Sequence, residues 1–123
     1  MTGRLLAVMV TFRRPLDLDD TIDWLLHEPT QLARLVVVDH EATASTRASV
    51  ERYRASGRPV DHVSTNDNSG PAGGFAIGMA LLLDQADGGD WIMTLSDDGP
   101  PHRPLFADLL TSAERCAELN PAM

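Results

Sequence analysis

The chain has 123 residues, which fits one domain with a hydrophobic core and leaves no room for a second full domain. With 43% hydrophobic and 23% charged residues, its composition is that of a globular protein and excludes a disordered or fibrous one. A formal net charge of -8 without a clustered Lys/Arg stripe excludes binding to nucleic acid or anionic lipid, so an anionic ligand would need a cation or backbone N–H groups.

Continuous apolar runs predict the strands. Leu5–Thr11 and Leu35–Val38 have the pattern of strands that are buried on both faces of a parallel sheet. Val60–Ser64 and Trp91–Leu95 are shorter candidates. The first run is too short for a membrane-spanning helix and no signal-peptide cleavage site follows it, so we expect a strand there and no transmembrane segment.

Helical patterns lie between and after these strands. In chain order they are a helix with Leu18, Ile22, Leu25 and Leu26 on one face, a helix from about Ser45 that includes Val50 and Tyr53, a helix from about Gly74 to Ala86, and a helix from Leu105 to Leu119. The third is apolar nearly all round, so we expect it to be covered on both sides or to face a partner, with self-association into a homo-oligomer. The alternation predicts an α/β fold, a Rossmann-like parallel sheet with helices on both faces.

Cysteine and histidine residues predict no separate metal centre. The single cysteine, Cys116, cannot form an internal disulfide, and it is interpreted as a core thiol in a reducing cytoplasm. His102 is close to an acidic pair but is interpreted as a loop residue. His27 and His62 are expected at the surface.

Ligands of such sheets bind beyond the carboxyl ends of the strands, where the winding direction reverses. After the first strand, "TFRRP" offers Arg13 and Arg14, which would either bind phosphate oxygens or lie in a solvated turn. After the second strand, Asp39 would either accept hydrogen bonds from a ribose hydroxyl or a base N–H, or simply end the strand.

A glycine-rich stretch, "STNDNSGPAGGFAIG", follows the third strand. Asn66, Asn68 and Gly70 suit a turn, and Gly73 and Gly74 are expected to open the next helix. These glycines would let the backbone approach an anionic ligand, or they would let the helix pack tightly on the sheet. The stretch is neither a dinucleotide fingerprint nor a P-loop, which disfavours nicotinamide chemistry and simple nucleotide hydrolysis.

Two adjacent carboxylates, Asp97 and Asp98, follow the fourth strand in "WIMTLSDDGPP". Hard divalent ions such as Mg²⁺ or Mn²⁺ take one or two carboxylates from a protein, with phosphates and waters completing the shell. Because "DDGPP" is also good turn chemistry, a solvated turn cap is the alternative.

Taken together, "VTFRRP", "VVVDH", "NDNSGPAGGFAIGM" and "WIMTLSDDGPP" resemble the donor-binding half of family 2 glycosyltransferases of the GT-A fold. The chain is most similar to the bacterial branch that includes galactofuranosyl- and rhamnosyltransferases. The resemblance covers nearly all of the chain and rests on four motifs in the right order and spacing.

The resemblance implies a glycosyltransferase that binds a nucleotide-diphosphate sugar, UDP- or dTDP-linked, through Mg²⁺ or Mn²⁺ and transfers the sugar to a glycan acceptor. The residues that match the family's donor site are Thr11, Phe12 and Arg13 after the first strand, Asp39 at the base, Asn68, Gly70, Gly73 and Gly74 beside the nucleoside, and Asp97 and Asp98. Asp97 would serve the ribose side and Asp98 the metal, and both carboxylates are candidate metal ligands.

The chain departs from the family pattern in several places. Ser96 replaces the first of three aspartates, His40 stands where asparagine is usual, and Pro71 lies within the glycine loop. A full GT-A domain continues past the acidic motif into the acceptor site and the catalytic base, so we expect 1–123 to be one truncated nucleotide-sugar-binding domain with no assignable base.

Two other functions were weighed against this one. The alternative is a non-catalytic nucleotide-binding or interaction module derived from the same fold. A receiver-like phosphotransfer domain fits poorly, because it needs an acidic pair after its first strand, where "TFRRP" is basic.

Overall fold

The computed structural model describes residues 4–12, 15–28, 32–40, 44–65, 70–95, 111–112 and 115. Within these ranges strands and helices alternate in the order β1 (Leu5–Thr11), α1 (Pro15–His27), β2 (Arg34–Asp39), α2 (Ala44–Ala55), β3 (Val60–Ser64), α3 (Gly70–Gln85) and β4 (Trp91–Leu95). This order confirms the α/β prediction. The helix predicted over Leu105–Leu119 lies largely outside the described residues, of which Thr111, Ser112 and Arg115 are helical.

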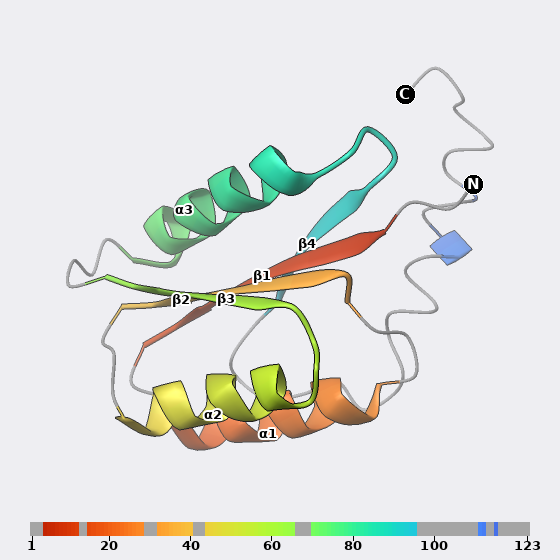
Figure 1. Cartoon of the computed structure of the whole chain (residues 1–123). Helices are drawn as coiled ribbons and strands as arrows, with labels where there is room; N and C mark the ends of the chain where they lie inside the picture. Colours follow the sequence, from red (N-terminus) through yellow and green to blue (C-terminus); the bar gives the residue numbers. More distant parts are fainter. Residues whose placement is uncertain are drawn as a thin grey trace.

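The four strands form one parallel sheet in the order β3-β2-β1-β4. Because crossovers between parallel strands are right-handed, winding from β1 to β3 places α1 and α2 on one face, and returning from β3 to β4 places α3 on the other. Figure 1 shows this arrangement, with α3 alone above the sheet and the other two helices below it. The winding direction therefore reverses between β1 and β4, where ligands of such sheets bind.

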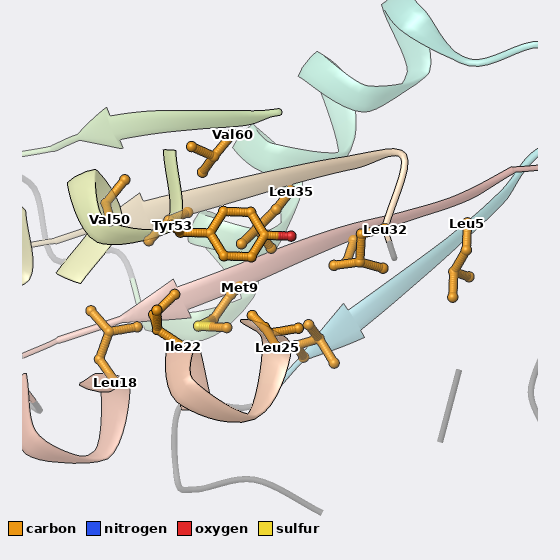
Figure 2. Close-up of a cluster of buried hydrophobic side chains, with 13 residues drawn as sticks. Leu5, Met9, Leu18, Ile22, Leu25, Leu32, Leu35, Val50, Tyr53 and Val60 are labelled. Atoms are coloured by element: carbon orange, nitrogen blue, oxygen red, sulfur yellow. The ribbon is translucent and has the colours of Figure 1, made fainter. Parts of the chain in front are cut away.

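Apolar side chains cover both faces of the two central strands. In β1, Leu5, Ala7 and Met9 face α1 and α2, whereas Leu6 and Val8 face α3. Burial on both faces explains why these strands are continuous apolar runs rather than alternating ones. Figure 2 shows the larger cluster, in which side chains of α1 and α2 meet those of the sheet: Leu18, Ile22, Leu25, Val50, Tyr53, Met9 and Leu35.

Helix α3 lies unusually close to the sheet through two glycines. An ideal Cβ on Gly78 would lie 2.0 Å from Val8 Cγ2, and one on Gly74 would lie 2.8 Å from both Val10 methyl carbons. The helix begins at Gly70, four residues before the predicted start at Gly74. Pro71 is compatible with this earlier start, because a first-turn residue needs no N–H for the helix.

The sheet covers only one side of α3. Leu82 is fully buried, whereas Ile77, Met79 and Leu83 are exposed on the helix, Leu83 by 64%. A partner for this exposed side of α3 and self-association of the chain both stay predictions. In the described part of the chain, no helix has the length and apolar character needed to span a bilayer.

Ion pairs join neighbouring strands at the amino edge of the sheet. The Arg4 guanidinium donates to the Asp90 carboxylate with Nη2 2.8 Å from Oδ2, and the Arg4 backbone N–H donates to Oδ1 at 3.0 Å. The backbone N–H of Asp87 also donates to this carboxylate. Between β2 and β3, Arg34 Nη2 lies 2.6 Å from Asp61 Oδ1.

Replacing Gly78 with alanine should destabilise the protein, because the new methyl group would overlap the Val8 side chain. Overpacking costs about 1–3 kcal/mol, which exceeds the roughly 0.5–1 kcal/mol that alanine gains over glycine in a helix. Urea unfolding followed by circular dichroism measures the change. Gly88→Ala is the matched control, since nothing lies within 4 Å of its Cβ position; equal stability of the two variants would contradict the close packing.

The Arg4–Asp90 contact should make the free energy of unfolding decrease at acidic pH. The hydrogen bond from the Arg4 side chain holds the pKa of Asp90 well below its usual range, with further contributions from the Asp87 and Arg4 backbone N–H groups. In the unfolded chain the Asp90 carboxyl has a pKa of about 4. Below that pH the unfolded chain binds a proton that the folded chain does not yet bind. The contribution of the contact to stability is therefore complete above this pH and is lost progressively below it.

The measurement is the free energy of urea unfolding between pH 3 and pH 6. Asp90→Asn should show a smaller loss of stability with falling pH than the unchanged chain. Asp84→Asn, which removes an exposed carboxylate on α3, is the charge-matched control and should keep the original slope. If both variants respond to pH alike, the contact does not contribute.

Candidate functional site

The carboxyl ends of the strands form one edge of the sheet, beside the reversal point. Thr11 of β1 pairs with Asp39 of β2, which pairs with Ser64 of β3, so three strands end level. On the other side of β1, Leu95 of β4 pairs with Met9. The sequence-predicted residues Thr11 and Asp39 are therefore direct neighbours across two strands.

One polar group lies on the face that α1 and α2 cover. Side chains alternate along a strand, which places Thr11, Asp39 and His62 on this face with Met9 and Val60. The Asp39 side chain is only 1% exposed, and its Oδ2 lies 3.2 Å from His62 Nε2. The prediction that His62 is a surface residue is wrong: its side chain is 14% exposed and contacts the buried carboxylate.

The hydroxyl of Thr11 is the most informative atom of this group. Thr11 is 1% exposed, and among the described residues its Oγ1 is buried without a hydrogen-bond partner. Burying such a group unpaired costs about 1–3 kcal/mol, and a valine of the same shape would avoid the cost. A buried hydroxyl without a described partner, beside a carboxylate at the edge where ligands of such sheets bind, makes this edge the candidate site.

A second polar group lies on the face that α3 covers. His40 is 4% exposed, and its Nδ1 lies 2.8 Å from Thr65 Oγ1. Its Nε2 lies 2.9 Å from the place of a Cβ on Gly74. Backbone bonds from His40 N to Thr11 O and from Thr65 N to Asp39 O hold these residues at the strand ends. Gly74 is thus required for packing on His40 and Val10, while its contact with a ligand stays a prediction.

Of the remaining residues that the sequence predicts for the site, the structure describes some and not others. Phe12 follows β1 and is 36% exposed, and Gly70 and Gly73 lie in the first turns of α3. Outside the described residues lie Arg13, Asn68, Asp97 and Asp98. Across the ranges that are described, no three His, Cys, Asp or Glu side chains come together as metal ligands, so the predicted metal site is untested.

Helix dipoles add a favourable potential for anions at this edge. Each of α1, α2 and α3 follows the carboxyl end of a parallel strand, so its N-terminus lies on the same side of the sheet as Thr11 and Asp39. Helix N-termini present unpaired N–H groups and partial positive charge. The edge can therefore attract a phosphorylated ligand even though the chain is acidic overall.

The contacts of His40 and His62 could not be predicted from the sequence, for a physical reason. His40 and Thr65 are 25 residues apart, and Asp39 and His62 are 23 residues apart. Such pairs form only when neighbouring strands pair in a particular register, and sequence motifs do not specify that register. Period-two alternation from Val60 was the one available signal, because it assigns His62 to the buried face.

The Thr11→Val variant should be more stable than the unchanged chain. It keeps the shape of the side chain and removes a buried hydroxyl without a described partner, so the free energy of unfolding should rise by about 1 kcal/mol. Ser49→Ala is the comparison variant and should be less stable than the unchanged chain. The Ser49 hydroxyl donates to Asp19, and its loss should lower the free energy of unfolding by about 1 kcal/mol. Urea unfolding measures both, and a destabilised Thr11→Val would show that the hydroxyl is already paired.

Comparison with known proteins adds independent findings. The family model described as Glycosyl transferase family 2 matches residues 6–119. The chain is 36% identical over 126 residues to the galactofuranosyltransferase GlfT1 of Mycobacterium tuberculosis (strain ATCC 25618 / H37Rv), a match that covers 98% of this chain and 40% of that protein. It is 35% identical over 116 residues to the Mycolicibacterium smegmatis protein of the same name, covering 93% and 35%. The chain spans well under half the length of these relatives.

Proposed function

The chain belongs to glycosyl transferase family 2, and from this premise we propose that it is the donor-binding half of a glycosyltransferase. The proposed donor is a nucleotide-diphosphate sugar, UDP- or dTDP-linked, held through Mg²⁺ or Mn²⁺. Because the relatives are named galactofuranosyltransferases, a galactofuranosyl group passed to a glycan acceptor is the favoured reaction. Residues for the acceptor and the catalytic base are not assigned.

The Thr11 hydroxyl, which has no hydrogen-bond partner among the described residues, lies beside the Asp39 carboxylate and carries this proposal. Uracil and thymine each present one ring N–H donor flanked by two carbonyl oxygens. A carboxylate can accept from that N–H, and a hydroxyl can donate to a neighbouring carbonyl. Thr11 and Asp39 are opposite each other on adjacent strands, and we assign one pyrimidine to both. Both side chains are about 1% exposed, so the proposal requires that the groups covering them move when the base binds, and the partly exposed Phe12 offers the base an apolar surface.

The diphosphate is assigned to the side of β4. The winding reversal lies between β1 and β4, and Asp97 and Asp98 follow β4 directly in the sequence. A carboxylate doublet with phosphate oxygens is a suitable ligand set for Mg²⁺ or Mn²⁺. We assign Asp97 to the ribose side and Asp98 to the metal, which would neutralise charge on the departing diphosphate.

Calorimetric titration of the chain with UDP, with and without Mn²⁺, tests donor binding. We expect binding that Mn²⁺ strengthens, and Asp98→Asn should remove that strengthening. Asp39→Asn should weaken UDP binding about tenfold, because it replaces a charged acceptor of the base N–H. Thr11→Val should weaken binding several-fold although it stabilises the fold.

The control for these variants is Asp20→Asn, which removes an exposed carboxylate on α1 and should leave UDP binding unchanged. No heat from UDP with or without Mn²⁺ would contradict the proposal. It would favour an interaction module that kept the fold and lost nucleotide binding.

A further inference from the structure

The buried Asp39 carboxylate has a backbone fixed on both sides. Asp39 pairs with Thr11 of β1 and with Ser64 of β3, and its carbonyl oxygen accepts a 2.8 Å hydrogen bond from Thr65 N. Its side-chain torsions are set by the contacts that the carboxylate makes. The contact between Asp39 Oδ2 and His62 Nε2, at 3.2 Å, acts on those torsions.

We take the imidazole as the donor in this contact. An ionised carboxylate has no proton to give, so the contact then requires the His62 tautomer with a proton on Nε2, which donates to Oδ2. His62 comes from β3, the strand next to β2, and its side chain is 14% exposed. A shielded donor from a rigid strand fixes the orientation of the carboxylate it contacts.

Orientation matters because uracil and cytosine differ at neighbouring atoms. Uracil carries a hydrogen-bond donor at N3, whereas cytosine has an acceptor at N3 and a donor amino group on the adjacent C4. A carboxylate that turns freely can accept from either donor. A carboxylate held in one orientation favours the base whose N–H group points at the carboxylate oxygen.

We propose that His62 is a positioning residue that fixes Asp39 and thereby sets the preference of the donor site for a pyrimidine with an N3–H, such as uracil, over cytosine. The inference rests on the proposed binding of a nucleotide-diphosphate donor at this edge. His62 acts through Asp39 and needs no contact with the nucleotide. Its removal should change base selectivity more than overall affinity for nucleotides.

The test is calorimetric titration with UDP and with CDP, both with Mn²⁺, on a matched pair of variants. His62→Gln places an amide N–H near the position of Nε2, whereas His62→Asn is one methylene shorter and cannot reach Asp39. We expect the ratio of UDP to CDP affinity to fall about tenfold in His62→Asn, the usual effect of losing a hydrogen bond to a charged group. His62→Gln should keep most of the original ratio.

Controls separate positioning from folding. His27→Gln changes an exposed histidine on α1 and should leave both affinities unchanged. Thermal melting by circular dichroism shows which variants are folded, and His62→Leu provides a second variant without the donor. If neither His62→Asn nor His62→Leu folds, His62 is needed for the fold and the positioning role is overturned.

The remaining outcomes are distinct. An equal loss of UDP and CDP affinity in folded His62→Asn, or an unchanged ratio, would overturn the positioning role and leave donor binding intact. Absence of UDP binding by the unchanged chain would overturn the donor-binding proposal and this inference with it.

Discussion

The structure depends on the position of β1 at the centre of the parallel sheet. This strand is hydrogen-bonded to β2 on one side and to β4 on the other, and it is buried on both faces. Since parallel neighbours require right-handed crossovers, the place of β1 determines which face each helix covers. The same constraint puts the reversal of winding beside Thr11, at the end of a strand that is buried on both faces.

Close packing of α3 extends this constraint to the second face. Gly74 and Gly78 bring the helix within van der Waals contact of Val8, Val10 and His40. The glycines of a motif that the sequence associates with ligand binding therefore have a packing role as well. The packing role places the beginning of α3 at the carboxyl edge, beside the candidate site.

The sequence predicted the elements well because β1, β2 and β4 contain distinct apolar runs and helical patterns separate the strands. Leu5–Thr11, Val60–Ser64 and Trp91–Leu95 were predicted with the observed bounds, and family membership followed from motif order. The start of α3 was misplaced because Pro71 and the glycines resemble a turn. The contact of His62 with Asp39 depends on which strands are neighbours, which a single sequence does not specify; donor and metal contacts themselves stay predictions.

The ion pairs at the amino edge lie at the opposite end of the strands from Thr11 and Asp39. Arg4 with Asp90, and Arg34 with Asp61, join strand beginnings, whereas the polar groups of the candidate site follow strand ends. The charged contacts that stabilise the amino edge are thus separate from the candidate site along each strand. Substitutions of these charged residues can therefore change thermal tolerance while leaving the residues of the opposite edge in place.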